Sequence, residues 1–197
     1  DEIAVAYGDN ITCFWRVKAI DNHGIMSDWS TPSEFVLNAI NDSPAQVKNV
    51  ISPAEYEEVS SVTMSWEAVD DPDLTDTPAT IAYRVELSKD IGFSMDVITV
   101  QTAPGVTKFV PENLTDNSEW FWLITPIDDE GLVGSVSNIF SFIYNIENDD
   151  PDNFSLNSPA NNSIEDSATF AFSWSQALDP DPGDEVSYTL TVAKNVA

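Results

Sequence analysis

The sequence predicts an all-β protein made of repeated two-sheet β-sandwiches, and three observations support this prediction. Short stretches of alternating apolar and polar residues recur between clusters of Pro, Gly, Asn and Asp, which is the pattern of half-buried antiparallel strands. No stretch of ten or more residues follows the 3.6-residue period of an amphipathic helix. The same pattern also occurs twice, so that Trp15 corresponds to Trp122, 107 positions later. About seven short strands in a unit of roughly 100 residues are typical of a β-sandwich.

The repeat divides the chain into one complete unit and two partial ones. We expect residues 41–147 to form the complete unit, residues 1–40 to be the C-terminal half of a preceding unit, and residues 148–197 to be the N-terminal half of a further unit. A unit of this size can bury a core of its own. Because half a sandwich exposes apolar strand faces, we expect other copies of the chain, or neighbouring repeats of a longer chain, to cover the partial units.

Each predicted strand carries a row of apolar side chains on one face. In chain order the rows are Trp15, Val17 and Ala19; Val62, Met64 and Trp66; Tyr83, Val85 and Leu87; Trp120, Trp122 and Ile124; Phe170, Phe172 and Trp174; and Tyr188, Leu190 and Val192. Large aromatic side chains on inward positions favour core packing over a sugar-stacking surface. The predicted core residues are therefore Trp15, Trp66, Tyr83, Trp122, Trp174 and Tyr188.

The complete unit resembles a fibronectin type III domain. The resemblance is carried by a strand that ends at Trp66, by residues 83–87 (Tyr-Arg-Val-Glu-Leu), and by Leu114 followed six residues later by Trp120. Residues 14–30 are similar to the last two strands of bacterial members of this family. The family usually has Tyr where this chain has Trp120, so the hydrogen bond of that hydroxyl is lost. The resemblance implies tandem immunoglobulin-like sandwiches, a fold that serves adhesion, spacing and receptor functions alike.

The charge of the chain excludes two classes of partner. Asp and Glu number 34 against seven Lys and Arg, which gives a formal net charge of −27. Phosphate binding depends on Lys and Arg, so nucleic acid is excluded, and an anionic membrane surface would repel the chain. One cysteine excludes a disulfide framework within the chain.

Many of the acids are concentrated in loops and in the linkers between units. We predict that these residues bind metal: Asp42, Asp70, Asp71, Asp73, Asp76, Asp128, Asp129, Asp149, Asp150, Asp179, Asp181 and Asp184. Each close pair of carboxylates costs about 4 kcal/mol at 4 Å in an effective dielectric near 20. Ca²⁺ removes this cost and takes 6–8 oxygen ligands of the kind that these loops offer. The alternative is that Asp-Pro-Asp and Asn-Asp are turn-forming sequences exposed to solvent.

The resemblance also implies where these loops lie. Residues 70–76, the hairpin 128–130 and the linker 41–42 should share one pole of the sandwich, where a unit meets the preceding one. Residues 112–117 should lie at the opposite pole and face the next unit. The linkers are also similar, over a few residues, to the calcium-binding linkers of cadherins.

The sequence does not predict an enzyme. Its one histidine, His23, lies in a predicted turn, and Cys13 has no histidine near it in the sequence. No phosphate-binding glycine loop and no Cys/His zinc spacing occurs. We expect an extracellular or cell-surface repeat protein with a structural or adhesive role, a stalk or filament stiffened by Ca²⁺. The alternative is a non-catalytic accessory or spacer module of a secreted polysaccharide-active enzyme, with a cell-surface or polysaccharide ligand.

Overall fold

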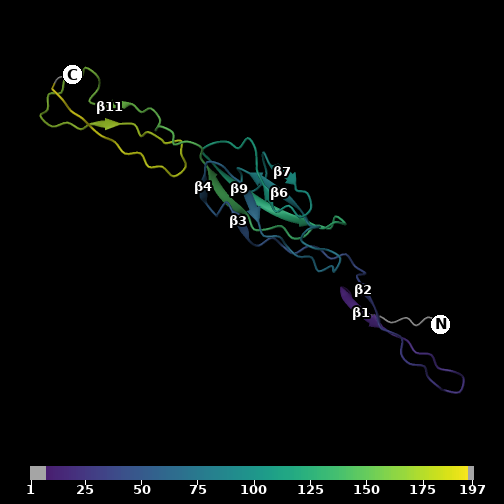
Figure 1. The fold of residues 1–197 in the computed structure, drawn as a ribbon. Coiled ribbons are helices and arrows are strands. Elements are labelled where there is room, and N and C mark those ends of the chain that lie inside the picture. The colour runs from purple at the N-terminus through teal and green to yellow at the C-terminus, as the bar shows by residue number, and fades with distance from the viewer. Residues whose placement is uncertain (1–7, 195–197) are drawn as a thin grey trace.

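The structure is a computed structural model that describes residues 8–194. The molecule is elongated, with β1 and β2 near one end, a broad central part, and β11 near the other end (Figure 1). In the described residues all regular elements are strands, and no helix has the length and hydropathy that a membrane crossing needs. The strands are β1 (Ile11–Trp15), β2 (Ser33–Leu37), β3 (Val50–Ser52), β4 (Glu57–Val59), β5 (Met64–Trp66), β6 (Ala82–Ser88), β7 (Ile98–Gln101), β8 (Lys108–Phe109), β9 (Ser118–Ile127), β10 (Phe140–Tyr144), β11 (Leu156–Ser158) and β12 (Ser173–Trp174).

The central part is a sandwich of two sheets. One sheet has the order β3-β5-β8, and the other has the order β4-β10-β9-β6-β7. All pairings are antiparallel except that of β4 with β10, which is parallel. The chain crosses from the first sheet to the second between β3 and β4 and returns to β5. It crosses again between β5 and β6, returns between β7 and β8, and crosses once more to β9. This strand order confirms the predicted all-β, immunoglobulin-like fold.

Three aromatic side chains join the two sheets of the sandwich. Trp66 comes from β5, whereas Tyr83 and Trp122 come from β6 and β9, and all three are almost fully buried. The ring centroids of Trp66 and Tyr83 are 5.3 Å apart with an edge-to-face geometry, and those of Trp66 and Trp122 are 6.5 Å apart. The Tyr83 hydroxyl accepts a hydrogen bond from the Val69 N–H at 3.1 Å. The alternation of apolar residues in each strand therefore places one large ring from each strand in a shared core.

Three of the predicted core residues are not buried, and the cause is the same for each. Trp15 is 54% exposed and Tyr188 is 36% exposed, while Trp174 is half-buried. Their segments form two-stranded sheets, β1-β2 and β11-β12, and no second sheet faces either of these among the described residues. Tyr188 lies outside any strand and packs on Trp174 and Phe154, each with a centroid distance of 5.4 Å. The core prediction is wrong for these three residues in the isolated chain.

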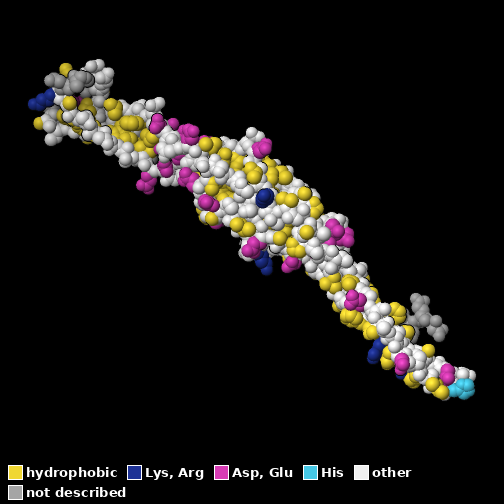
Figure 2. Space-filling model, viewed as in Figure 1, with side chains coloured by type: hydrophobic (Ala, Val, Ile, Leu, Met, Phe, Trp, Pro, Cys, Tyr) yellow, Lys and Arg dark blue, Asp and Glu magenta, His cyan; other side chains and the backbone are white. Residues whose placement is uncertain are grey.

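Each sheet lies inside one of the predicted units. Sheet β1-β2 falls in residues 1–40, the sandwich in residues 41–147, and sheet β11-β12 in residues 148–197. The boundaries of the units themselves stay a prediction. In Figure 2, acidic side chains gather where the central sandwich meets the β11-β12 segment, and hydrophobic side chains are exposed on that segment.

Gly134 lets the linker before β3 pack closely on the segment after β9. A Cβ atom at this position would lie 2.5 Å from the carbonyl oxygen of Pro44 and 2.9 Å from Cγ of Pro126. We expect Gly134→Ala to lower the free energy of unfolding by about 1–3 kcal/mol, because the backbone must move to admit the methyl group. Chemical denaturation measures this loss. Gly8→Ala is the control, since its Cβ would meet no atom within 4 Å, and equal losses in the two variants would contradict the prediction.

Candidate metal centre

The linker that precedes β3 is held by polar side chains from three other loops. The Asn41 Nδ2 donates to Asp128 Oδ2 at 2.9 Å, and the Asp42 N–H donates to Asp73 Oδ2 at 2.8 Å. The Asn10 Nδ2 donates to Asp42 Oδ2 at 2.9 Å. The loop before β1, the linker, the loop after β5 and the hairpin after β9 therefore meet at one place, which we call the first junction.

The linker that precedes β11 makes two of these three bonds again, at what we call the second junction. The Asp149 N–H donates to Asp181 Oδ2 at 2.7 Å, as Asp42 does to Asp73. The Asn117 Nδ2 donates to Asp149 Oδ2 at 2.8 Å, which reproduces the bond from the loop before β1. Equivalent residues of the repeat thus make equivalent contacts in two places.

A third pair of bonds completes this correspondence. The Asp9 Oδ1 accepts from the Ala39 N–H at 2.6 Å, and the Asp116 Oδ1 accepts from the Ile146 N–H at 2.7 Å. In both junctions an aspartate from the loop before β1 or β9 thus accepts a hydrogen bond from the backbone at the start of the following linker. Because three different bonds recur at the repeat spacing, the junction is encoded in the repeat and is not an accident of one loop.

Carboxylates converge at both junctions. Among the described residues, three groups each offer carboxylate oxygens within 4.8 Å of one another: Asp71, Asp73 and Asp76; Asp76, Asp128 and Glu130; and Asp179, Asp181 and Asp184. Several of these acids are unusually buried for charged residues, since Asp73 is 2% exposed, Asp181 3% and Asp76 9%. The buried oxygens Asp71 Oδ2, Asp76 Oδ2 and Asp181 Oδ1 have no hydrogen-bond partner in the described part of the chain. Such oxygens are a suitable donor set for a hard cation.

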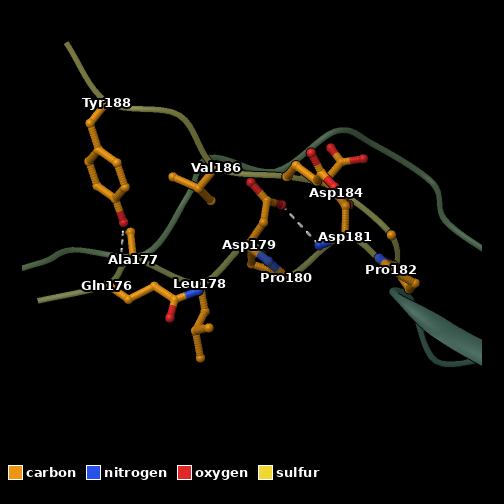
Figure 3. Close-up of a pocket in the computed structure, with 12 residues that line it drawn as sticks. Gln176, Ala177, Leu178, Asp179, Pro180, Asp181, Pro182, Asp184, Val186 and Tyr188 are labelled. Atoms are coloured by element: carbon orange, nitrogen blue, oxygen red, sulfur yellow. Dashed lines mark hydrogen bonds between the residues drawn. The ribbon is translucent and has the colours of Figure 1, made fainter.

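Figure 3 shows the carboxylate group of the second junction. Asp179, Asp181 and Asp184 lie close together on the segment after β12, in a cleft lined by residues 176–186 and Tyr188. The Asp181 N–H donates to Asp179 Oδ1 at 3.0 Å. The corresponding bond at the first junction runs from the Asp73 N–H to Asp71 Oδ1 at 2.9 Å. This local turn is the reason that two aspartates separated by a proline present their carboxylates to one side.

The acids of the first junction raise one another's pKa values. Burial, together with the charges of Asp73 and Asp128, raises the pKa of Asp71. Burial and the neighbouring Asp129 carboxylate raise the pKa of Asp76. A hydrogen bond with the Asp129 side chain, and then burial, raise the pKa of Glu130. Without a cation, the ionised form of each group is therefore disfavoured in the folded chain.

The metal-free protein should consequently gain stability as the pH falls from neutral toward the ordinary pKa values of these carboxyl groups. The folded pKa values of Asp76 and Glu130 lie above the ordinary values of 3.8 and 4.5. The stabilisation that comes from protonating these two groups is thus complete at a pH below their ordinary pKa values. It is lost as the pH rises through their pKa values in the folded protein. Thermal denaturation of metal-free protein at stepped pH measures this, and Asp76→Asn should flatten the dependence. A melting temperature that falls over the same interval would contradict the prediction.

The structure brings together most of the residues predicted to bind metal. Asp42, Asp71, Asp73, Asp76 and Asp128 lie at the first junction, and Asp149, Asp179, Asp181 and Asp184 lie at the second. Asp129 is exposed and lies beside Asp76. Asp70 and Asp150 are exposed and belong to none of the three groups.

The sequence interpretation missed Asp9 and Asn10, which bond to the linker at the first junction. The signal that could have found them was available. Residues 112–117 were expected to face the next unit, and Asp116 and Asn117 do contact the linker before β11. The same argument applies to Asp9 and Asn10, which stand 107 positions earlier in the repeat.

The comparisons with known proteins give structural neighbours alone. No family model matches the chain, and no curated protein matches it. The FN1–FN3 domains of chicken CNTN1 share 13% identity with it over 76% of this chain and 48% of that one, with a TM-score of 0.43. The chain therefore spans about half the length of that structure. The sixth fibronectin type III domain of human fibronectin type III domain containing protein 3 shares 13% identity over 58% of this chain and 98% of that one, with a TM-score of 0.40.

The strand order of the central part and its shared aromatic core identify its fold. A sheet of three strands faces a sheet that contains β10, β9, β6 and β7 in sequence, and β5 and β9 bring the two central tryptophans together. The central unit is thus an immunoglobulin-like sandwich.

Proposed function

We propose that this chain is part of a structural or adhesive repeat protein, a stalk or filament of fibronectin type III-like units whose junctions are stiffened by calcium. The observation that carries the proposal is the pair of buried carboxylates Asp73 and Asp181. Each accepts the N–H of a linker aspartate, and each lies within a group of carboxylates. A cation held by these groups would fix the linker against the next unit. The proposal assigns no catalytic step to the chain.

Calcium fits the donor set better than other metals do. The candidate ligands are all oxygens, and both Cys13 and the exposed turn residue His23 lie outside the three groups, so the preference of zinc for nitrogen and sulfur is not met. Calcium accepts 6–8 oxygens in a flexible geometry, whereas magnesium requires a near-ideal octahedron. Loops that offer carboxylates from several segments suit the more adaptable ion.

The proposed location is the cell surface or the extracellular space. Calcium sites of extracellular modules have dissociation constants of about 10⁻⁴–10⁻³ M. We expect a junction of this kind to be filled by calcium outside the cell. The proposed partners are other copies of the chain, neighbouring repeats of a longer chain, and a cell-surface or polysaccharide ligand. The net charge of −27 disfavours nucleic acid and anionic membranes.

Small-angle X-ray scattering of the chain tests the stalk. With millimolar calcium we expect a longer maximum dimension and the scattering of a rigid rod, and with a chelator we expect the scattering of units joined flexibly. The double variant Asp73→Asn/Asp181→Asn should scatter as the chelated protein does under both conditions. Identical curves with calcium and with chelator would overturn the proposal of stiffened junctions.

A second candidate function is an accessory module of a secreted polysaccharide-active enzyme. It is favoured by the side chain of Phe14 on β1, which is 69% exposed. Trp29 lies nearby under Arg16, whose guanidinium carbon is 4.4 Å from the ring centroid. Exposed rings of this kind can stack on sugars. Affinity electrophoresis in gels that contain soluble polysaccharides distinguishes this function, because Phe14→Ala should abolish any retardation that it causes.

A further inference from the structure

We propose that the first junction binds two calcium ions that share the carboxylate of Asp76. This inference rests on calcium binding as part of the proposed function, and it specifies how many ions bind and which residues hold them. One ion would lie among Asp71, Asp73 and Asp76, and the other among Asp76, Asp128 and Glu130.

The geometry supports two positions that share one residue. Asp71, Asp73 and Asp76 come from the loop after β5, whereas Asp128 and Glu130 come from the hairpin after β9. In each group every residue offers an oxygen within 4.8 Å of the others. A carboxylate has two oxygens, so Asp76 can serve one ion with each of them.

The state of Asp76 is an independent indication of a ligand. Its side chain is 9% exposed, and its Oδ2 has no hydrogen-bond partner among the residues that the structure describes. Its Oδ1 accepts only a long bond from Thr80 Oγ1, at 3.3 Å. Burying a charged oxygen without a partner is strongly unfavourable. A cation bound at this oxygen removes that penalty.

The charge of the junction also favours two ions over one. Five carboxylates belong to the two groups, and a single calcium ion would leave three negative charges uncompensated in a partly buried place. Two ions supply four positive charges against five. Lys and Arg side chains do not neutralise these carboxylates, because the one ion pair found in the described part of the chain joins Arg84 to Glu86.

The hydrogen bonds of the ligands connect both ions to the linker. The Asp73 carboxylate accepts the Asp42 N–H, and the Asp128 carboxylate accepts the Asn41 amide. The Leu132 N–H donates to Asp128 Oδ1 at 2.7 Å and orients that carboxylate further. Each ion position thus contains one residue that holds the linker, so that filling both positions would fix adjacent linker residues.

Counting bound calcium tests this inference. Asp181→Asn serves as the background variant, because it removes a buried ligand of the single carboxylate group at the second junction. Equilibrium dialysis and calorimetric titration of this full chain with calcium chloride should give two ions per chain. Adding Asp128→Asn should leave one ion, and adding Asp76→Asn should weaken binding of both ions by about tenfold or more. The control Glu119→Gln changes an exposed acid on β9 and should leave two ions.

The outcomes separate the two proposals. One ion in the background variant, unchanged by Asp128→Asn, would overturn the shared pair and leave calcium binding intact. No bound calcium in the wild-type chain would overturn both proposals. Circular dichroism of each variant in chelator checks that it folds, and we expect each to fold because it loses a negative charge from a crowded group.

Discussion

Replacing Trp122 with alanine is expected to lower the free energy of unfolding of the central sandwich by about 3–5 kcal/mol, the usual cost of removing a buried aromatic side chain. Trp122 is fully buried. The centroid of its ring lies 6.5 Å from that of Trp66 and 5.5 Å from that of Phe140. Its removal leaves a cavity between the two sheets. Since domains of this size are stable by about 5–15 kcal/mol, this loss is a large part of the total. Guanidinium denaturation followed by circular dichroism measures it.

The matched control is Trp15→Ala, which changes the equivalent residue of the preceding unit. Trp15 is 54% exposed in the isolated chain, so the expected change is within about 0.5 kcal/mol. A loss for Trp122→Ala below about 1 kcal/mol would contradict the account of the core. A concentration-dependent loss for Trp15→Ala would show that another copy of the chain covers β1 and β2 in solution, as expected for a unit completed between molecules.

The contrast between Trp122 and Trp15 also explains how far the sequence could predict the fold. The alternation of apolar residues identifies which face of a strand is inward, and it does so equally well for β1 and β9. Whether that face is buried depends on a second sheet, which the pattern of a single strand does not contain. Trp66, Tyr83 and Trp122 are buried because both sheets of their unit are present.

The sequence predicts which loops supply the acids of the candidate metal centre, but it does not predict which of these acids lie close together. Clusters of aspartate between strands indicated which loops to compare, and the repeat indicated that the junctions would be alike. The sequence could not show that Asp76 lies within reach of both Asp71 and Asp128. That proximity depends on how the loop after β5 folds against the hairpin after β9, and single loops do not encode contacts with distant ones.

Removing calcium should lower the melting temperature of the protein strongly. A ligand present at a hundred times its dissociation constant stabilises the folded state by about 2.7 kcal/mol. For a domain of about 100 residues each kcal/mol shifts the melting temperature by roughly 4–8 °C, so we expect a difference of roughly 10–20 °C. The physical reason is that the buried oxygens of Asp73 and Asp76 would lose the proposed cation, which would compensate their repulsion. Scanning calorimetry in chelator, and in calcium at about a hundred times its dissociation constant, measures the difference.

Screening must be separated from binding, because any salt will stabilise a chain with a net charge of −27. Sodium chloride at the same ionic strength reproduces the screening alone, and it should recover only a small part of the shift. The variant Asp73→Asn keeps almost the same net charge, so its response to sodium should be normal while its response to calcium should be reduced. Equal melting temperatures in calcium and in matched sodium would mean that the acidic loops are solvated turns. The rod would then owe its shape to the hydrogen bonds of Asp42 and Asp149 without help from a metal.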